Sequence, residues 1–398
     1  DQCENCGAVI QQGELINPLS KNTKTSVELR ETEHYFLDWP KLQPFLESYI
    51  EKVTDYRDWV LKETKGWLKT GLKPREITRD LDWGVELPIS RIPEGERIKN
   101  IENKRIYVWF EAVIGYLSAS VEWADMVDGD WKKFWYGEDS YHYYFMGKDN
   151  LIFHTLFWPG QLHVYDDKLK LPDNVVISQF LNLEGQKFSK SRGLIVDPIH
   201  LADKFGVDPV RFYLTLIMPE SSDSNFSFDD FYEKVNNVLI GNYGNFVNRV
   251  LTLSKEVDFS TFKEEEVYEE VKSQTDLAFS LCIEAMNSAK FKDYLNGALS
   301  LSSFANAFMS EKEPWKLKEN KSEFEKVLKN LVYLVIGISQ LLSPVIPATT
   351  KKVFEMLSIP EQGSLSDLTR KVKVSEISPL FTKIEKEQIE EEKGNLPI

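Results

Sequence analysis

Residues 141–180 read YHYYFMGKDNLIFHTLFWPGQLHVYDDKLKLPDNVVISQF, and this stretch decides the fold class of the chain. Residues 141–146 have the aromatic and apolar composition of a strand, Gly-Lys-Asp at 147–149 interrupts it, and 150–162 has helical periodicity. A second apolar strand follows at 175–180. A strand, a helix and a strand in succession predict a parallel β-sheet with a site at the carboxyl ends of its strands.

The alternation extends toward the amino end, and a different pattern follows toward the carboxyl end. Upstream we expect helices at 35–70 and 111–123, a strand or turn at 77–84, and a short buried strand at 105–110. From residue 198 onward the apolar spacing is helical, at 198–204, 208–216, 228–254, 267–310 and 322–342. The sequence therefore predicts an α/β region followed by an all-α helical bundle.

The overall composition narrows the functional classes. The 398 residues suggest two or three domains, and 42% hydrophobic with 28% charged residues is typical of a soluble globular protein. The sequence has no apolar run of 18 residues, which argues against a membrane span, and its start does not resemble a signal peptide. Three cysteines indicate a reducing, cytoplasmic setting. A net charge of −15 argues against nucleic acid covering the whole surface but allows a local basic patch. The Glu-rich stretch 383–393 is expected to be a solvated helix or tail.

The loop 184–193, EGQKFSKSRG, has the composition of a polyphosphate site. Lys187 and Lys190 supply ammonium groups, and Ser189 and Ser191 supply hydroxyls beside them. Such groups hold and stabilise developing negative charge on phosphate oxygens. A solvated basic loop is the alternative interpretation.

The turn after the first quoted strand has the features of a nucleotide contact. Gly147 allows a ligand to approach the backbone closely, and Lys148 and Asp149 lie where a strand meets a helix amino end. Asp149 suits a ribose hydroxyl, as acidic residues do in dinucleotide-binding folds. His154 faces inward among aromatic residues, where a core histidine is the ordinary interpretation.

Residues 107–116, YVWFEAVIGY, predict a pocket for a linear apolar side chain. Trp109 is expected to end the strand, and Ala112 and Tyr116 to lie on the first helical turns behind it. A small residue between aromatic walls leaves such a space, and a thioether gains from aromatic contact. Aromatic residues that simply fill the core are the alternative.

Two further patterns are less specific. Cys3 and Cys6, in the sequence CENCG, form half of a zinc knuckle, and an unpaired turn with two thiols is the alternative. Asn245 and Arg249 are four residues apart and share a helix face, and Trp315 follows a long helix in Glu-Pro-Trp. An ordinary polar pair and a tryptophan that covers a helix end would give the same pattern.

Three of these segments, in this order, resemble the methionyl-tRNA synthetase family of class I aminoacyl-tRNA synthetases. They are 107–116, then FMGKDNLIFHTLFWPGQL at 145–162, then LNLEGQKFSKSRG at 181–193, where Phe188 replaces the methionine of the KMSKS signature. TRDLDWG at 78–84 resembles the family's RDLxWG segment, whereas Val113 stands where many relatives carry proline. The resemblance covers nearly the whole chain and is least diagnostic over 360–398.

The resemblance implies a role for each candidate residue. It assigns ATP phosphates and the transition state to Lys187 and Lys190, and the adenylate to Gly147, Lys148, Asp149, Ser189 and Ser191. It assigns the methionine pocket to Trp109, Ala112, Tyr116, Ile152 and His154. It assigns the CAU anticodon to Asn245, Arg249 and Trp315, and zinc to Cys3 and Cys6. It also implies ATP with Mg²⁺ as cofactor, Zn²⁺ with half its site missing, and L-methionine and tRNA(Met) as substrates, with no membrane.

The resemblance also implies domain boundaries, listed here in chain order. They are a remnant of a zinc-knuckle connective peptide at 1–34, the second half of a Rossmann-type catalytic domain at 35–178, a KMSKS-loop and stem-contact region at 179–235, a helical anticodon-binding domain at 236–360, and a carboxyl-terminal extension at 361–398.

The family's HIGH motif is missing from these residues, because none of the five histidines has that neighbourhood. We therefore expect a carboxyl-terminal portion of the enzyme, inactive alone, that a complementary amino-terminal chain would complete if the gene is split. A non-catalytic tRNA-binding module at 236–355 is the alternative. A synthetase for valine, leucine or isoleucine is another alternative, against which the absence of a large editing insertion and the trio Trp109, Tyr116 and His154 favour methionine.

Overall fold

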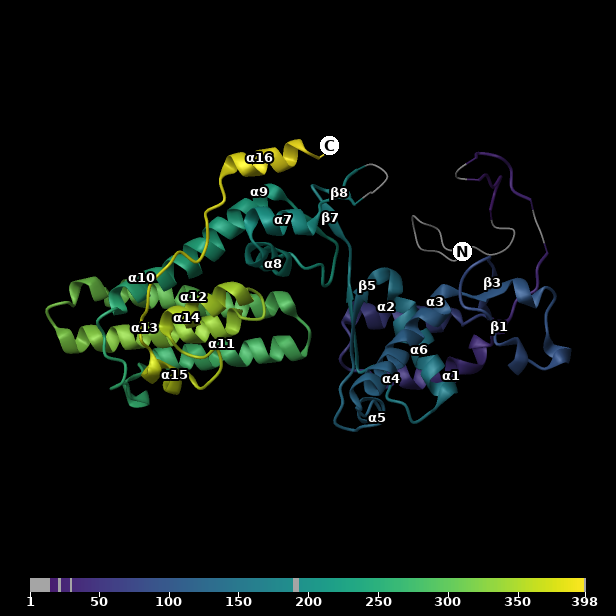
Figure 1. Ribbon diagram of the computed structural model, residues 1–398, viewed down its shortest axis with the longest axis horizontal. Coiled ribbons are helices and arrows are strands. Elements are labelled where there is room, and N and C mark those ends of the chain that lie inside the picture. Colours follow the sequence, from purple (N-terminus) through teal and green to yellow (C-terminus); the bar gives the residue numbers. More distant parts are fainter. Residues whose placement is uncertain (1–14, 21–22, 29–30, 189–192, 397–398) are drawn as a thin grey trace. The chain divides into compact units, whose positions relative to one another are not determined.

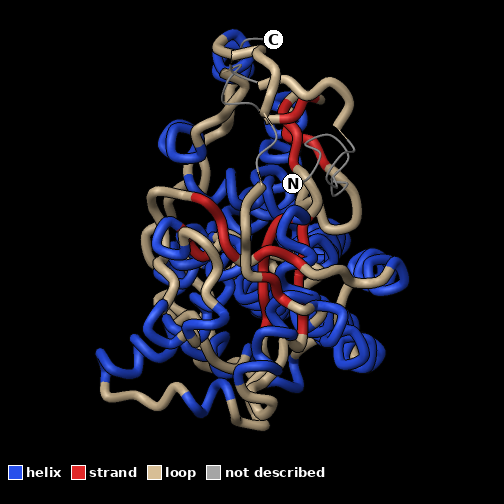
Figure 2. Tube along the Cα trace, turned by 90° about the vertical axis from the view of Figure 1, so that its right-hand side faces the viewer, coloured by secondary structure: helices blue, strands red, loops and turns tan. Residues whose placement is uncertain are grey.

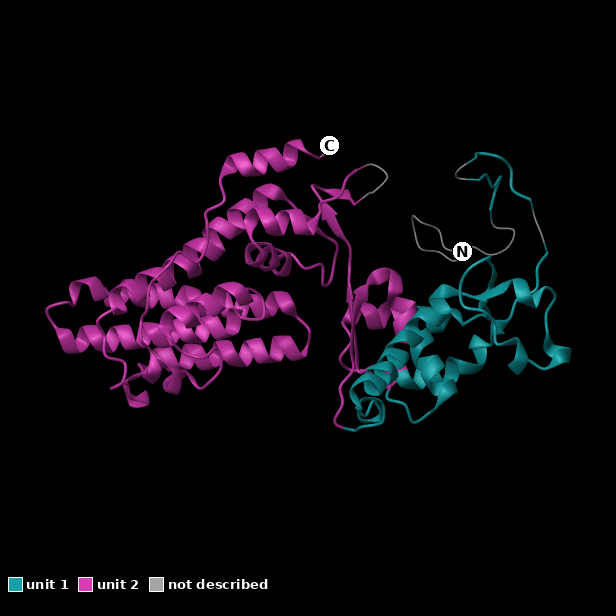
Figure 3. Cartoon of the chain, in the orientation of Figure 1, with its two compact units in different colours: residues 1–49, 66–138, 156–170 teal, residues 50–65, 139–155, 171–398 magenta. Residues whose placement is uncertain are grey.

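The computed structural model of the chain describes residues 15–20, 23–28, 31–188 and 193–396 (Figure 1). Helices make up most of it and the strands are short (Figure 2). Two compact units are present, unit 1 from 1–49, 66–138 and 156–170, and unit 2 from 50–65, 139–155 and 171–398 (Figure 3). Each unit is described by itself below. No helix among the described residues has the length and apolar character that a membrane crossing requires.

Unit 1 contains two short antiparallel ladders and several helices. β1 (Phe36–Leu37) pairs with β2 (Arg75–Glu76), and β3 (Thr78–Asp80) pairs with β4 (Lys104–Ile106). The helices that lie wholly or partly in this unit are α1 (Trp39–Lys52), α2 (Asp58–Thr70), α3 (Val108–Glu111), α4 (Gly115–Val127), α5 (Lys132–Trp135) and α6 (Trp158–Tyr165). 3₁₀ turns lie at Ile89–Arg91, Glu94–Glu96, Ile101–Asn103 and Ala112–Ile114.

Stacked aromatic rings form the centre of this unit. Trp39 stacks on Phe157 with ring centroids 4.1 Å apart, and Trp158 meets the edge of Trp135 at 5.9 Å. These four rings are buried, so burial of apolar area stabilises the unit at this point.

The predicted buried strand at 105–110 is wrong beyond Ile106. β3 has three residues, and its last pair with β4 is Thr78 with Ile106, so the ladder offers no partner farther along. The chain turns into α3 instead, which places Trp109 in a helix and leaves its side chain 46% exposed. Aromatic and β-branched composition predicted a strand here, but a strand also needs a partner.

The predicted strand, helix and strand at 141–180 are confirmed. β5 (Tyr143–Gly147) and β6 (Asn174–Ser178) are parallel neighbours, with Phe145 opposite Val176. Between them the chain forms a 3₁₀ turn (Lys148–Asn150), a π-helical segment (Phe153–Phe157) and α6. The sheet that results has its carboxyl end at Gly147 and Ser178, as the sequence predicted.

A hairpin follows this sheet in unit 2. β7 (Leu181–Leu183) pairs antiparallel with β8 (Gln186–Lys187), and β9 (Ser224–Phe226) runs parallel to β7 on its other side. The two turn residues, Glu184 and Gly185, both have positive φ, at 45° and 77°. This is the geometry that two-residue hairpin turns require.

The rest of unit 2 is helical, and each predicted helical stretch is confirmed. The elements are α7 (Pro198–Phe205), α8 (Val207–Leu216), α9 (Phe228–Glu233), a π-helix (Lys234–Gly244), α10 (Asn245–Ser254), α11 (Glu269–Asn287), α12 (Phe291–Lys312), α13 (Lys321–Leu342), α14 (Pro347–Leu357), α15 (Leu365–Lys371) and α16 (Lys386–Gly394), with 3₁₀ turns at Glu264–Glu266 and Pro314–Lys316. The stretch 267–310 is two helices, because the chain reverses at Ala289, where φ is 51°.

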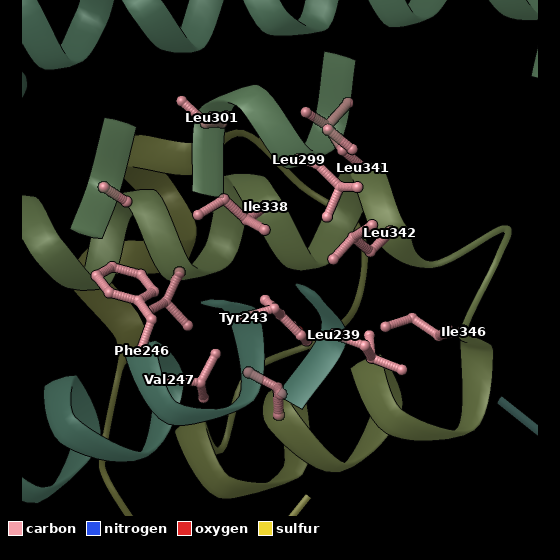
Figure 4. Close-up of a cluster of buried hydrophobic side chains, with 14 of the residues drawn as sticks. Leu239, Tyr243, Phe246, Val247, Leu299, Leu301, Ile338, Leu341, Leu342 and Ile346 are labelled. Carbon is pink, nitrogen blue, oxygen red and sulfur yellow. The ribbon is translucent and has the colours of Figure 1, made fainter. Parts of the chain in front are cut away.

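The bundle core lies among the π-helix, α10, α12 and α13 (Figure 4). Leu239, Phe246 and Ile338 are fully buried there, and the buried hydroxyl groups of Tyr243 and Ser339 share a 2.8 Å hydrogen bond. A buried polar pair of this kind stays favourable because each group satisfies the other. The bundle thus has a closed core with its polar members partnered at this point.

The Glu-rich helix α16 is not solvated on all sides, which corrects the prediction for 383–393. Ile389 and Glu392 are buried, and the Glu392 carboxylate accepts hydrogen bonds from Lys204 at 2.7 Å and His200 at 2.9 Å. Lys393 also pairs with Asp229 at 2.9 Å. Charge density alone predicted solvation, whereas complementary charges on α7 and α9 hold one face of this helix.

Candidate functional site

Two lysines from distant parts of the sequence meet at one aromatic ring in unit 2. The Lys148 ammonium lies 3.9 Å from the centroid of the Phe180 ring, and the Lys187 ammonium lies 5.8 Å from it. Lys148 follows β5, Phe180 follows β6, and Lys187 lies on β8. Lys148 of the predicted turn and Lys187 of the predicted basic loop therefore come together beyond the carboxyl end of the sheet.

Asp223 fixes this arrangement. One oxygen, Oδ1, accepts a hydrogen bond from the Lys148 ammonium at 3.1 Å and another from the Phe180 backbone N–H at 3.0 Å. These two hydrogen bonds, the backbone one first, hold the pKa of Asp223 below its ordinary value. The carboxylate therefore stays charged and positions Lys148 beside the ring.

The hairpin that carries Lys187 is held at its turn. The Glu184 carboxylate accepts a hydrogen bond from the Phe228 N–H at 2.8 Å, and the Asn225 side chain accepts one from the Gly185 N–H at 2.6 Å. These bonds stabilise the positive φ at Glu184, a conformation that costs free energy in residues other than glycine. The structure gives Lys187 an exposed position at the end of this hairpin.

Gly147 and Asp149 lie on the open side of the same turn. A Cβ atom at Gly147 would meet no heavy atom within 4 Å, so nothing in the described protein covers this backbone. The Asp149 side chain is exposed, one residue from Lys148 in the 3₁₀ turn. The cluster offers cations, an acidic acceptor and open backbone, which suits a nucleotide polyphosphate with its ribose. Ser189, Lys190 and Ser191 lie outside the described residues.

The predicted pocket residues are divided between the two units. In unit 2, Ile152 and His154 are buried, and the His154 imidazole Nδ1 lies 2.9 Å from the Asn150 carbonyl oxygen. Burial lowers the pKa of His154, which keeps the imidazole neutral. In unit 1, Ala112 is exposed, and Trp109 and Tyr116 are 46% and 41% exposed.

Unit 1 presents an apolar surface with a hollow in it. A cavity of about 590 Å³ lies between α4 and α6, with Leu117 and Val121 on one side and Trp158 and Leu162 on the other. The Gln161 side-chain oxygen, which also lines this cavity, is buried without a hydrogen-bond partner. An apolar hollow with an unpaired polar acceptor at its wall has the features of a binding surface.

The predicted polar face of the bundle is confirmed. Asn245, Asn248 and Arg249 are exposed and line a hollow of about 420 Å³. The Arg249 guanidinium donates to the Asn306 side-chain oxygen at 2.6 Å, and the Asn306 amide donates in turn to the side-chain oxygen of Asn242 at 2.6 Å. Hydrogen-bonding side chains on a rigid helix face are typical of sites that contact the edges of unpaired bases.

Trp315 lies just beyond the end of α12. Glu313 reverses the chain there with a φ of 43°, and the indole of Trp315 is 43% exposed in the 3₁₀ turn that follows. A half-exposed indole on an ordered turn can stack on a base. The sequence predicted this local structure correctly.

Sequence reasoning missed Asp223, Phe180 and Asn306. Asp223 sits in a polar loop, SSDSNFS, whose composition predicts only a turn, and Phe180 read as the last residue of a strand. Asn306 is one of several small polar residues in a long helix. Each acts through a contact more than 40 residues away, and no spacing along the chain encodes that.

The described residues contain no group of three or more His, Cys, Asp or Glu side chains arranged to hold a metal ion. Cys3 and Cys6, the predicted zinc ligands, lie outside the described residues. Cys282 is a buried core thiol that donates to the Tyr294 carbonyl at 3.4 Å, and burial raises its pKa to about 11.

Comparison with known proteins gives the family. A family model described as tRNA synthetases class I (M) matches residues 1–251. The chain is 38% identical over 375 residues to the methionine--tRNA ligase of Cutibacterium acnes and 39% identical over 377 residues to that of Thermobifida fusca. Each alignment covers 90% of this chain and 61% of the relative, so the chain spans less than two thirds of the length of these relatives.

Solved structures share the fold. The apo methionyl-tRNA synthetase of Mycobacterium tuberculosis matches with a TM-score of 0.74 at 21% identity, over 92% of this chain and 72% of that one. The same enzyme in complex with methionyl-adenylate matches with a TM-score of 0.74 at 22% identity, over 91% and 71%. The extent of the family-model match, more than half of the chain, decides the assignment: this chain belongs to the methionyl-tRNA synthetase family of class I tRNA synthetases.

Proposed function

We propose that this chain provides the pyrophosphate-releasing and tRNA-reading parts of a methionine--tRNA ligase that acts in the cytoplasm. The observation that carries the proposal is the convergence of Lys148 and Lys187 on the Phe180 ring, where Asp223 binds Lys148 and the Phe180 backbone. Two ammonium groups held at one point fit the negative charge of a triphosphate. A structural relative, the M. tuberculosis enzyme, binds methionyl-adenylate, and this supports an adenylate formed from ATP and methionine as a ligand of this chain.

The reaction proceeds by in-line displacement. A carboxylate oxygen of methionine attacks the α-phosphorus of ATP, the bond to the β-phosphate oxygen breaks, and pyrophosphate leaves with the electron pair. Lys187, together with Lys190, neutralises the charge that develops on the leaving group, and Lys148 steadies the phosphates. A terminal ribose hydroxyl of tRNA then attacks the adenylate carbonyl and displaces AMP. No covalent intermediate with the protein is required, because positioning and electrostatics supply the catalysis.

The remaining assignments rest on the family resemblance. Gly147 and Asp149 contact the adenosine part, with Ser189 and Ser191 beside the phosphates. Trp109, Ala112, Tyr116, Ile152 and His154 form the methionine pocket, in which a neutral imidazole suits an apolar thioether. Mg²⁺ enters as the counter-ion of ATP. Zn²⁺ is held by Cys3 and Cys6 with two further ligands from elsewhere, and metal analysis of Cys3→Ser against the unaltered chain tests this.

The HIGH half of the nucleotide fold, in the same polypeptide or in a complementary chain if the gene is split, completes the enzyme. The apolar face of unit 1 supports this, because Trp123 and Met126 of α4 are 44% and 79% exposed and lie on the helix that borders the cavity. Exposed apolar area of this extent marks an interaction surface. Family membership excludes the valine, leucine and isoleucine enzymes that the sequence left open.

Methionine-dependent exchange of pyrophosphate with ATP tests the catalytic proposal. We expect no exchange by this chain alone and exchange when the HIGH half of a relative such as the C. acnes ligase is added. Lys187→Ala should then lower the exchange rate by about a hundredfold, the range for a lost transition-state contact. Lys69→Ala, an exposed lysine of α2, is the matched control and should leave the rate unchanged. Full activity of Lys187→Ala would refute the assignment.

A tRNA-binding module without catalysis is the second candidate, and the self-contained bundle favours it for the chain alone. Titration with a CAU anticodon stem-loop and its CAC variant tests whether the bundle reads the anticodon at all. The catalytic proposal and the module both require preference for CAU, and Arg249→Ala should cost about 1–3 kcal/mol of that preference. Exchange in the completed enzyme supports only the ligase, and equal affinity for the two stem-loops contradicts both.

A further inference from the structure

One part-buried guanidinium joins three separate segments of unit 2. Arg57 Nη1 donates to the carbonyl oxygens of Ile177 at 2.6 Å and Glu220 at 3.2 Å, and Nη2 donates to the carbonyl of Ala289 at 2.8 Å. Ile177 belongs to β6, and Ala289 is the reversal between α11 and α12. The planar five-donor geometry of arginine suits such a junction, which a lysine ammonium does not reproduce.

The Glu220 side chain completes the junction from the other direction. Its Oε1 atom accepts hydrogen bonds from the backbone N–H groups of Phe291 at 2.7 Å and Lys292 at 3.3 Å, and lies 3.6 Å from Arg57 Nη2. Phe291 is the first residue of α12. Lys290, at the N-cap position before it, makes no side-chain capping hydrogen bond. Glu220 therefore serves as the amino-terminal cap of α12 from a loop outside the helix, where its charge also complements the helix dipole.

The sheet contacts the same turn directly. The Tyr143 hydroxyl donates to the Asn287 carbonyl at 2.8 Å, and the Phe145 ring lies 6.0 Å from the Phe291 ring. Both residues are on β5, which ends at Gly147. The amino end of α12 is thus held against both strands whose carboxyl ends border the candidate nucleotide site.

The same helix reaches the proposed anticodon face. Asn306, which accepts the hydrogen bond from Arg249, lies 15 residues along α12 from Phe291, or about 22 Å at the rise of an α-helix. Trp315 follows the far end of α12 after a single reversal at Glu313. α12 packs between α11 and α13 and buries residues along its length, so it acts as a stiff connection.

Resting on the proposed function, we propose that Arg57 and Glu220 are positioning residues that clamp the amino end of α12 to β6. The clamp fixes the position of α12 relative to the sheet that carries the candidate nucleotide site. α12 in turn binds Arg249 through Asn306 and is followed by Trp315. Correct anticodon contact then sets the position of the tRNA relative to that site. Neither residue touches a substrate.

The test uses the enzyme completed with the HIGH half, in three assays: methionine-dependent pyrophosphate exchange, CAU stem-loop affinity, and charging of tRNA(Met). In Arg57→Lys and Glu220→Gln we expect exchange and stem-loop affinity within about twofold of the unaltered enzyme, because the residues proposed to contact ATP, methionine and the stem-loop are intact. Charging kcat/KM for tRNA should fall about tenfold or more, the scale of coupling between distant sites. Arg370→Lys, whose guanidinium donates to the Phe262 carbonyl at 3.1 Å inside the bundle, is the matched control and should change none of the three.

A double-mutant cycle separates a coupled path from two independent defects. Asn306→Ala and Glu220→Gln alter opposite parts of α12, and independent effects at that separation multiply. We expect the double variant to lose less charging than the product of the single losses, because either change alone already breaks the registration. Hydrogen exchange at the Phe291 amide should accelerate in Glu220→Gln, which reports the clamp itself.

Each outcome decides the matter. Charging that falls while exchange and stem-loop affinity hold supports the clamp. Equal losses in all three assays, or a multiplicative double variant, would reduce Arg57 and Glu220 to general structural residues. Undiminished charging in both variants would overturn the proposal outright. If the unaltered completed enzyme neither exchanges pyrophosphate nor binds the CAU stem-loop, the proposed function fails, and the clamp loses its role with it.

Discussion

Two helices that are both rich in apolar residues, α4 in unit 1 and α12 in unit 2, have opposite surroundings. Ala124 is the buried residue of α4, whereas α12 buries ten residues, among them Leu295, Ala298 and Met309. Neighbouring helices cover α12 on both sides, and the described part of unit 1 leaves Met126 in solvent. The contrast shows that apolar periodicity identifies a surface to be buried but does not say which chain buries it.

The largest expected effect comes from truncating the same residue type, methionine, in each of the two helices. Met309→Ala in α12 should lower the free energy of unfolding by about 2–5 kcal/mol, because it leaves a cavity in a closed core. Met126→Ala in α4, where the side chain is 79% exposed, should change it by less than about 0.5 kcal/mol. Urea unfolding of the two variants measures both values. Equal costs would mean that α4 is covered in this chain after all.

A second pair of variants tests the separate roles proposed for two exposed indoles. Trp123 in unit 1 and Trp315 in unit 2 are 44% and 43% exposed, so they differ in place rather than burial. Trp123→Ser should weaken association with the HIGH half by about tenfold, as loss of an aromatic interface anchor does, and leave stem-loop affinity unchanged. Trp315→Ser should do the reverse. Titration by fluorescence anisotropy gives both constants, and a shared loss in either variant would contradict the division of roles.

The sequence predicted what depends on local spacing. The parallel strands β5 and β6, the helices after residue 198, and the shared face of Asn245 and Arg249 follow from periodicity over a few turns. The prediction failed at 105–110, because strand formation depends on a partner, and β3 ends opposite Ile106. The composition of a segment does not indicate how long the strand that pairs with it will be.

The candidate site divides in the same way. Gly147, Lys148, Asp149 and Lys187 were identified from sequence because their spacing resembles a family pattern. Asp223, which holds Lys148 beside Phe180, accepts hydrogen bonds from that lysine 75 positions away and from the Phe180 backbone, and neither contact leaves a periodic signal. The Arg57 junction is of the same kind, since its three acceptors are backbone carbonyls that carry no sequence identity at all.

The smallest expected effect concerns α16, which is held both by the buried side chain of Ile389 and by charge pairs with α7 and α9. Burial alone would raise the pKa of Glu392, but hydrogen bonds from Lys204 and His200 outweigh it and leave the pKa below its ordinary value of 4.5. A lowered folded-state pKa stabilises the fold above the ordinary value, and this stabilisation is lost as the pH falls through the folded-state pKa.

Hydrogen exchange of α16 followed from about pH 6 to about pH 3, at matched intrinsic exchange rates, measures this loss. We expect the α16 amides to lose protection in that range before those of α12. Glu392→Gln should remove most of the pH dependence of α16 and weaken its docking at neutral pH by about 1 kcal/mol, because Lys204 keeps a second partner in Glu391 at 2.6 Å. Glu390→Gln, an exposed neighbour, is the control. Simultaneous loss of protection in α12 and α16 would mean that the bundle and this helix unfold as one unit, and the contrast between apolar and charged burial would not extend to their stability.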